Sequence, residues 1–288
     1  MSADPPRIGR LVRFSLTTAD AKSAAQFYEA AFGCRRTATD RLCGPEFEEL
    51  TGVTGGADRI TLSLGREIIE LMQFDFPGEP YPRESSSSDL VFQHFAIVVA
   101  DMKQAFQRLS TIGGWTPIST AGPQHLPVSS GGVTAFKFRD PEGHPLELLA
   151  FPEGGNLSWP AVSADEICLG IDHSAISVSD SAASIAFYQN LGLSVSAHSF
   201  NHGIEQQKLD DVSGVQVDVT ALAPHCPTPH LELLCYRRAQ QRPTPVRKAS
   251  DIASTRVVFE LSRASKATDG HVKVRSMRDP DGHAFLIA

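Results

Sequence analysis

Histidine and glutamate are the residues of this sequence whose types and positions suggest chemistry. Ten histidines are spread over the chain, and three glutamates (Glu70, Glu147 and Glu232) each stand in an apolar frame, IIELMQF, PLELLAF and HLELLCY. Imidazole and carboxylate groups suit Zn, Fe, Mn, Co or Ni as ligands. The glycine-rich dinucleotide motif, the P-loop, the GxSxG nucleophile motif and HExxH are all absent from the sequence, so the usual nucleotide, serine-hydrolase and zinc-protease signals are missing.

The cysteines carry no comparable signal. They form no CxxC pair, and an odd number of scattered thiols in a long chain is typical of a reducing compartment. We interpret them as unreactive thiols rather than as nucleophiles. The five are Cys34, Cys43, Cys168, Cys226 and Cys235.

Composition limits the class of protein. The chain has 288 residues, 41% of them hydrophobic, which is ordinary globular material long enough for two domains. With 26 Lys and Arg against 33 Asp and Glu, the net charge of −7 argues against nucleic acid or an anionic membrane as the main partner. No apolar run approaches the ~20 residues of a membrane span, and the N-terminus has no apolar stretch of a signal peptide. We expect a soluble, cytoplasmic protein.

Four segments of the sequence resemble one another. They are LVRFSLTTAD at 11–20, FQHFAIVVAD at 92–101, GIDHSAISVSD at 170–180 and, more weakly, STRVVFEL at 254–261. Each is rich in β-branched and aromatic residues and predicts a strand. In the first three an Asp follows, well placed to cap an amphipathic helix. The helix pattern contains Phe-Tyr at 27–28 and again at 187–188, which we interpret as core packing.

The repeat predicts an organisation into modules. After the helix, each of the first three segments continues through several strands to its glutamate, and stretches rich in Pro, Gly and Ser at 74–89 and 151–165 read as linkers. We place module 1 at 8–75, module 2 at 90–152, module 3 at 168–238 and a truncated module 4 at 252–288. The predicted fold class is α+β.

Two copies of an Asp-Pro turn lie late in modules 2 and 4. DPEGH at 140–144 and DPDGH at 279–283 combine a Pro that fixes φ with a Gly free to take positive φ. We expect β-turns here, with His144 and His283 solvated beside them.

The sequence resembles the vicinal oxygen chelate superfamily, which includes glyoxalase I, methylmalonyl-CoA epimerase, extradiol dioxygenases and bleomycin-resistance proteins. The resemblance covers nearly the whole chain and rests on HSAISVSD…SIAFYQNLGL at 173–193 and FKFRDPEGHPLELLAF at 136–151. It implies tandem βαβββ modules whose mixed, curved sheets form two cups. It also implies a divalent metal (Zn, Ni, Mn, Co or Fe) bound by residues of the first and last strands of each module.

Carried onto this chain, the family's ligand positions differ between modules. Module 2 offers His94 and Glu147, and module 3 offers His173 and Glu232. Module 1 offers Arg13 with Glu70, and module 4 offers Arg256 with Leu286. The two positions of module 4 are much closer in sequence than those of the other modules, so we expect module 4 to lack a full-length helix. Guanidinium and leucine cannot serve as ordinary ligands.

Module pairing decides whether a complete ligand shell exists. Sequential pairing (1+2 and 3+4) divides the good ligands between two cups. Pairing 2+3 and 1+4 gives one cup with His94, Glu147, His173 and Glu232 and another with Arg13, Glu70, Arg256 and Leu286. We favour the second pairing because it gathers every good ligand at one site.

Substrate contacts are less well marked. The polar segment at 201–210 offers Asn201, His202 and Gln206 to the cavity of module 3. Arg13 and Arg256 either clamp an anionic group, which guanidinium geometry suits, or fill a collapsed cavity beside Glu70. We interpret the remaining histidines, His198, His225 and His230, as structural or solvent-facing.

Three functions follow from the resemblance. The first is a glyoxalase- or epimerase-type enzyme for a small substrate with adjacent oxygens, in which a metal stabilises an enediolate and Glu147 or Glu232 moves the proton next to the carbonyl. The second is an extradiol dioxygenase, whose Fe(II) needs two His and one carboxylate. The family's usual site for that iron lies between modules 3 and 4, where Arg256 and Leu286 stand. The third is a metal-free protein that binds a drug or metabolite.

Overall fold

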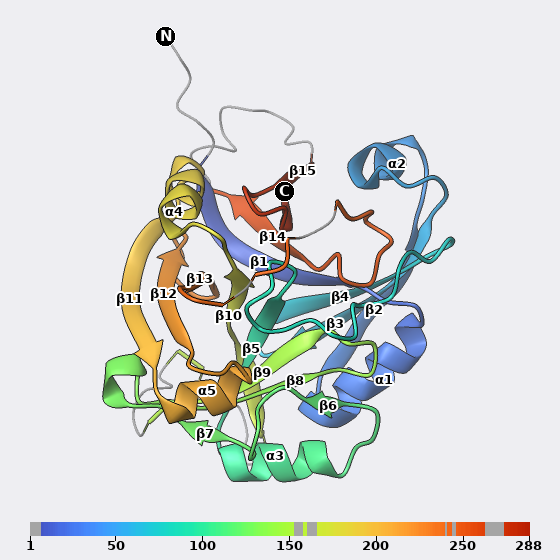
Figure 1. Ribbon diagram of the computed structural model, residues 1–288. Coiled ribbons are helices and arrows are strands. Elements are labelled where there is room, and N and C mark those ends of the chain that lie inside the picture. The colour runs from blue at the N-terminus through green and yellow to red at the C-terminus, as the bar shows by residue number, and fades with distance from the viewer. Residues whose placement is uncertain (1–6, 153–157, 160–165, 240, 244–245, 263–273) are drawn as a thin grey trace.

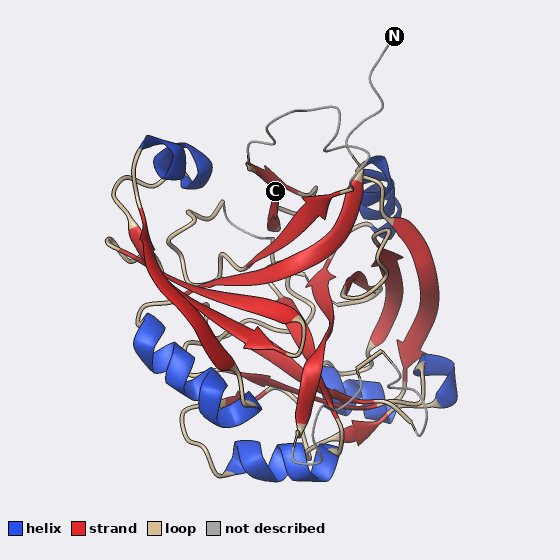
Figure 2. Ribbon diagram, turned by 180° about the vertical axis from the view of Figure 1, so that it is seen from behind, coloured by secondary structure: helices blue, strands red, loops and turns tan. Residues whose placement is uncertain are grey.

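The fold is built from two mixed β-sheets with helices packed on them. The computed structural model describes residues 7–152, 158–159, 166–239, 241–243, 246–262 and 274–288. Figure 1 shows strands β10 to β13 on one side of the molecule and β1 to β4 on the other, and Figure 2 shows the same curved sheets from behind. The predicted α+β class with two curved sheets is confirmed.

The first sheet joins modules 1 and 4. Its seven strands run in the order β15-β16-β14-β1-β4-β3-β2. Strand β1 pairs with β4 in parallel and with β14 antiparallel, so β1 and β14 form the seam between the modules. The strands are β1 (Ile8–Thr17), β2 (Arg35–Leu42), β3 (Ala57–Leu64), β4 (Glu67–Phe74), β14 (Arg256–Leu261), β15 (Arg275–Arg278) and β16 (Ala284–Ile287).

The second sheet joins modules 2 and 3. Its order is β11-β12-β13-β10-β5-β9-β8-β6, with β7 paired to β8. Strands β10 and β5 are antiparallel at the seam, while β10 pairs with β13 and β5 with β9 in parallel. The strands are β5 (Gln93–Val99), β6 (Thr116–Pro117), β7 (Gln124–His125), β8 (Thr134–Arg139), β9 (Pro145–Ala150), β10 (Cys168–Ser177), β11 (Ser194–His202), β12 (Gln216–Ala223) and β13 (His230–Tyr236). The predicted 2+3 and 1+4 pairing is therefore correct.

The aspartates after the first three repeated strands cap helices as predicted. Asp20 accepts hydrogen bonds from the Lys22 and Ser23 amides, and Asp101 and Asp180 cap α3 and α4 in the same way. The helices are α1 (Ala21–Phe32), α2 (Pro45–Thr51), α3 (Met102–Ser110), α4 (Ser181–Asn190) and α5 (Ile204–Asp210). The described part of module 4 is strand and loop, and residues 263–273, where its helix would stand, lie outside the described residues.

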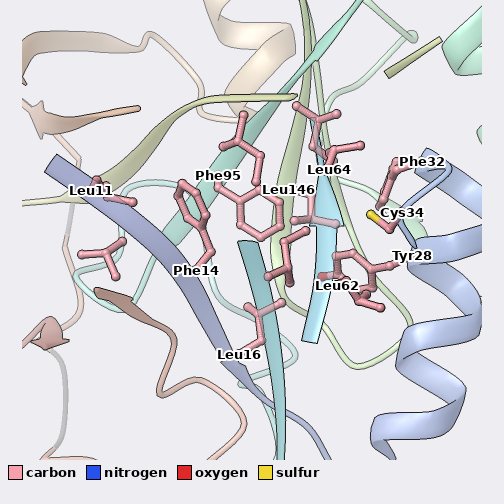
Figure 3. Close-up of a cluster of buried hydrophobic side chains, with 14 of the residues drawn as sticks. Leu11, Phe14, Leu16, Tyr28, Phe32, Cys34, Leu62, Leu64, Phe95 and Leu146 are labelled. Atoms are coloured by element: carbon pink, nitrogen blue, oxygen red, sulfur yellow. The ribbon is translucent and has the colours of Figure 1, made fainter. Parts of the chain in front are cut away.

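The main core lies between the two sheets and the helices. Alternate side chains of a strand point to opposite faces. On β1, Phe14 and Leu16 enter this core, and on β5, Phe95 does so. The Phe14 and Phe95 ring centroids are 5.2 Å apart, which joins the two sheets directly (Figure 3). The intervening residues of each strand, His94 among them, are left to face the concave sides of the sheets.

The two Asp-Pro turns form as predicted, but their histidines are buried. Gly143 and Gly282 take φ of 100° and 90°, as such turns require. His144 is 2% exposed: its Nδ1 lies 2.8 Å from Asp140 Oδ2 and its Nε2 3.0 Å from the Thr17 carbonyl oxygen. His283 is likewise buried and donates to the Ser177 carbonyl. The expectation of solvated histidines was wrong because each ring contacts backbone carbonyl oxygens of other modules, Thr17 and Ile252 for His144 and Ser177 for His283.

Candidate metal centre

Four neighbouring strands bring the predicted ligands together. His94 lies on β5, Glu147 on β9, His173 on β10 and Glu232 on β13, and these strands are adjacent in the order β13-β10-β5-β9. All four side chains line one cavity of about 490 Å³ on the concave face of the sheet. That volume falls in the ~300–1,000 Å³ range of small-molecule sites.

The polar atoms of the four residues converge. His94 Nε2 lies 2.8 Å from Glu147 Oε2, and His173 Nε2 lies 3.6 Å from the same oxygen and 3.5 Å from Glu232 Oε2. The two histidine rings are 5.6 Å apart, centroid to centroid. Among the described residues, one ligand atom each from His94, Glu147 and His173 falls within 4.8 Å of the other two.

Asp172 orients His173. Its Oδ2 lies 2.8 Å from His173 Nδ1, so that nitrogen donates to the carboxylate and Nε2 is turned into the cavity. His173 Nε2 is buried and has no hydrogen-bond partner. Histidine ligands of metals are commonly held by a carboxylate on the other ring nitrogen. An orphaned buried nitrogen aimed at two carboxylates is therefore what a divalent cation would complete, and the residues fit a metal.

Burial and charge act against each other on the titrating groups. Burial lowers the pKa of His94, outweighing its hydrogen bond to Glu147. Burial also opposes charge on His173, but Glu232, Asp172 and Glu147 together raise its pKa well above the ordinary value. For the two acids burial raises the pKa, but neighbouring histidines outweigh it. The pKa of Glu147 lies well below its usual range beside His173 and His94, and that of Glu232 falls to about 2 beside His173 and His230. Both carboxylates are thus ionised at neutral pH.

Besides Asp172, sequence reasoning missed further polar neighbours of this centre. His230, interpreted as structural or solvent-facing, lines the cavity with Nε2 3.4 Å from Glu232 Oε1. The available signal was its position two residues before Glu232, on the same face of a strand. Lys137 stands opposite Glu147 in the β8–β9 register, and its buried Nζ lies 2.7 Å from Asp210 Oδ1.

The other predicted contacts divide between cavity and surface. Asn201 and Gln206 are buried in the lining of the cavity, and Asn201 Oδ1 and Gln206 Oε1 have no hydrogen-bond partner. His202 is exposed and is not among the described residues that line the cavity, because it follows Asn201 on β11 and points to the opposite face. His198 lies at the rim with its side chain 57% exposed.

The seven-stranded sheet of modules 1 and 4 has an open cavity of its own. It measures about 400 Å³ and is lined by Arg13, Glu70, Arg256 and Leu286, the four residues expected there. Arg13 Nη1 lies 3.7 Å from Glu70 Oε1. The alternative of a collapsed cavity is therefore wrong, although the pairing of an arginine with Glu70 is present.

Comparison with known proteins identifies the class. The model of the Glyoxalase/Bleomycin resistance protein/Dioxygenase superfamily matches residues 10–148 and again 170–287. The chain belongs to this superfamily, and the resemblance inferred from its motifs is confirmed. None of the curated proteins matches the sequence.

Solved structures share the fold over nearly all of the chain. Glyoxalase I from Zea mays is 17% identical with a TM-score of 0.56, covering 96% of this chain and 91% of that one. A mutant of the same enzyme gives a TM-score of 0.60 over the same shares. A candidate dioxygenase from Bacillus subtilis subsp. subtilis str. 168 is 12% identical with a TM-score of 0.58, covering 98% and 86%. At these identities the likeness concerns the fold alone.

No helix in the described ranges is long and apolar enough to cross a membrane.

Proposed function

We propose that the protein is a metal-dependent enzyme of glyoxalase or epimerase type, which removes a proton next to a carbonyl group. The observation that carries this proposal is the orphaned Nε2 of His173, buried and facing the carboxylates of Glu147 and Glu232 beside His94. Superfamily membership and the fold shared with glyoxalase I support it.

His94, Glu147 and His173 are the residues we assign to the metal, with Glu232 able to complete the shell. Glu147 suits this role because its Oε2 lies within 4 Å of both imidazoles, 2.8 Å from His94 Nε2 and 3.6 Å from His173 Nε2, and its side chain is only 7% exposed. A divalent cation there would act as a Lewis acid and stabilise negative charge developing on adjacent substrate oxygens.

Glu232 is the residue we assign as the base. Its side chain is 21% exposed, three times the exposure of Glu147, so it can reach both the cavity and the centre. It is ionised at neutral pH and can accept the proton, while His230 beside Oε1 holds the carboxylate in place. The ammonium of Lys137, kept charged by Asp210, adds positive charge beside Glu147.

The substrate we propose is a small molecule with adjacent oxygens and an apolar part. Leu126, Leu149 and Leu209 supply apolar wall to the cavity, and Asn201 and Gln206 supply polar groups without partners. We propose no nucleic-acid or membrane partner, in keeping with the net charge of −7. We propose the cytoplasm as the compartment, because the five cysteines are all free.

Ring-cleaving dioxygenase chemistry is the second candidate. One observation favours it: His94, His173 and Glu147 supply the two imidazoles and one carboxylate that non-haem Fe(II) oxygenases use.

Exchange with solvent separates the two candidates. We expect the protein, supplied with Zn²⁺, Ni²⁺ or Co²⁺, to incorporate deuterium from D₂O next to the carbonyl of α-hydroxycarbonyl or 1,2-dicarbonyl compounds, as followed by NMR. EDTA should abolish exchange, and Glu232→Gln should slow it about 10²–10⁴-fold, the usual contribution of a general base. Oxygen uptake with catechols by the Fe(II) form, without any proton exchange, would instead establish the dioxygenase.

A further inference from the structure

The cavity of the seven-stranded sheet is strongly cationic in an acidic protein. The chain carries a net charge of −7. Yet among the described residues lining this cavity there is a single carboxylate, Glu70, against six cations: Arg13, Arg59, Arg247, Lys248, Arg256 and Arg278.

The single carboxylate is already engaged. Arg59 Nη1 lies 2.9 Å from Glu70 Oε1, and Arg13 Nη1 lies 3.7 Å from the same oxygen. Arg59 has a second partner in Asp40 at 2.7 Å. Of the other cations, none has a carboxylate oxygen within 4.0 Å among the described residues, so the cavity keeps an excess of positive charge.

Arg256 is the most deeply placed of these cations. It is 6% exposed, and its guanidinium donates to the Ala249 carbonyl at 3.1 Å and to Thr17 Oγ1 at 3.0 Å. Both acceptors are neutral, so they orient the guanidinium without balancing its charge. Burial lowers the pKa of Arg256 to about 10, which leaves it charged at neutral pH. A buried charge without a counter-charge destabilises a protein unless an ion of opposite sign enters.

Arg13 lies next to Arg256 on the same face of the sheet. Ser15 is the register partner of Arg256, and Arg13 is two residues from Ser15, so Arg13 and Arg256 are diagonal neighbours across the β1–β14 seam. The Nε of Arg13 is buried and has no hydrogen-bond partner. Two neighbouring guanidinium groups on one face of a sheet suit an oxyanion, because each guanidinium can donate a pair of N–H groups to it.

The rest of the lining is apolar. Phe47 and Leu50 of α2 face Met72 and Phe74 of β4 in the cavity wall, and the Phe47 and Phe74 rings are stacked with centroids 5.8 Å apart. Simple inorganic anions would leave this wall unused. We propose that the second cup binds an organic anion, with a carboxylate or phosphate head between Arg13 and Arg256 and an apolar body against Phe47 and Phe74.

Calorimetry with three matched probes tests the proposal. Phenylacetate and phenyl phosphate carry the two heads, and phenylacetamide is a neutral counterpart of the first. Using full-length His173→Ala protein removes a predicted ligand of the metal centre, so that a probe binding to metal does not obscure the result. We expect at least one anion to bind one per chain, and phenylacetamide to bind at least tenfold more weakly.

Substitutions then locate the bound anion. Arg13→Gln should weaken anion binding at least tenfold, and Arg256→Gln should do the same if it folds. Arg36→Gln, which removes a surface arginine paired with Glu29, should leave binding unchanged. Failure of both anions to bind, equal binding of the neutral amide, or binding that survives Arg13→Gln would overturn the proposal. Each of these outcomes leaves the proposed enzymatic function intact, because none concerns the metal centre.

Discussion

Asp172 is the residue that holds His173 in the orientation that the proposed metal centre requires. By accepting a hydrogen bond from Nδ1 it holds the ring so that Nε2, the atom that would bind a metal, faces the cavity. The immediate predecessor of a strand residue normally points to the opposite face, but the β10–β5 pairing is irregular between Ile171 and His173. Sequence alone does not reveal that irregularity, which is why Asp172 was not among the predicted site residues.

We predict that Asp172→Asn weakens metal binding about 10–100-fold, the usual cost of losing such a carboxylate. Titration of the metal-free protein with Zn²⁺ by calorimetry measures the effect. Asp58→Asn is the matched control, since Asp58 is exposed and pairs with Arg41 on the other sheet. Equal affinities for the wild type and Asp172→Asn would mean that Asp172 does not support a ligand.

His173 itself allows a sharper comparison. We predict that His173→Ala abolishes Zn²⁺ binding while its circular dichroism spectrum stays that of the folded protein. His198→Ala should bind Zn²⁺ normally, because His198 is mostly exposed at the rim. A His173→Ala protein that retained full affinity would remove His173 from the ligand set.

At the scale of elements, the Asp-Pro turns connect successive modules. Tyr28 of α1 donates to Asp140 in the first turn, and Tyr188 of α4 donates to Asp279 in the second. The recurrent Phe-Tyr pair is therefore core packing with a polar function added. The histidine of each turn also donates a hydrogen bond to a carbonyl of the preceding module, His144 to Thr17 and His283 to Ser177. Equivalent contacts therefore join module 1 to module 2 and module 3 to module 4.

Protonation of His144 should show in the stability of the protein. Its Nδ1 faces a carboxylate and its Nε2 faces two carbonyl oxygens, so both nitrogens donate. Burial opposes this charge, but Asp140 outweighs burial and raises the pKa of His144. Because the pKa of His144 is higher in the folded than in the unfolded protein, its protonation stabilises the fold. This stabilisation is complete below the pKa of the unfolded protein, near 6.5, and is lost as the pH rises through the pKa of the folded protein.

We therefore predict that His144→Gln is destabilised by about 1–3 kcal/mol at pH 6, because Asp140 loses a buried partner. The difference from the wild type should shrink as the pH rises above 7. Urea unfolding of both proteins at several pH values measures it. A difference that grew with pH would contradict the assignment of a charged His144.

How much of the structure could be predicted differs between elements. The repeated strands, their capping aspartates and the alternation that exposes His94 to the cavity follow from local pattern, and the resemblance assigned the ligand positions. The Lys137–Asp210 ion pair joins residues 73 positions apart and has no local signal. The burial of His144 depends on carbonyl groups of two other modules, at Thr17 and Ile252, which a turn motif does not encode.

At the scale of the whole molecule, one core supports two cups with different contents. The pairing of modules follows from the seams β1–β14 and β10–β5, and Phe14 and Phe95 join the sheets behind them. The proposed metal ligands lie in the cup of modules 2 and 3, and Arg13 and Arg256 lie in the cup of modules 1 and 4.

We predict that Phe95→Ala lowers the free energy of unfolding by about 3–5 kcal/mol, as large-to-small changes in a core do. Denaturant unfolding measures this, with exposed Val128→Ala as a control expected to change stability by less than about 0.5 kcal/mol. A loss under 1 kcal/mol for Phe95→Ala would show that the contact between the sheets contributes little.

The most direct test of the metal centre is anomalous diffraction from crystals grown with Zn²⁺, recorded on both sides of the zinc absorption edge. The proposed function predicts one strong anomalous peak per chain, lying between His94, Glu147 and His173, and its loss in His173→Ala crystals. A strong peak elsewhere, or none at this position at full Zn²⁺ saturation, would contradict the assignment of the cup of modules 2 and 3 as the metal centre.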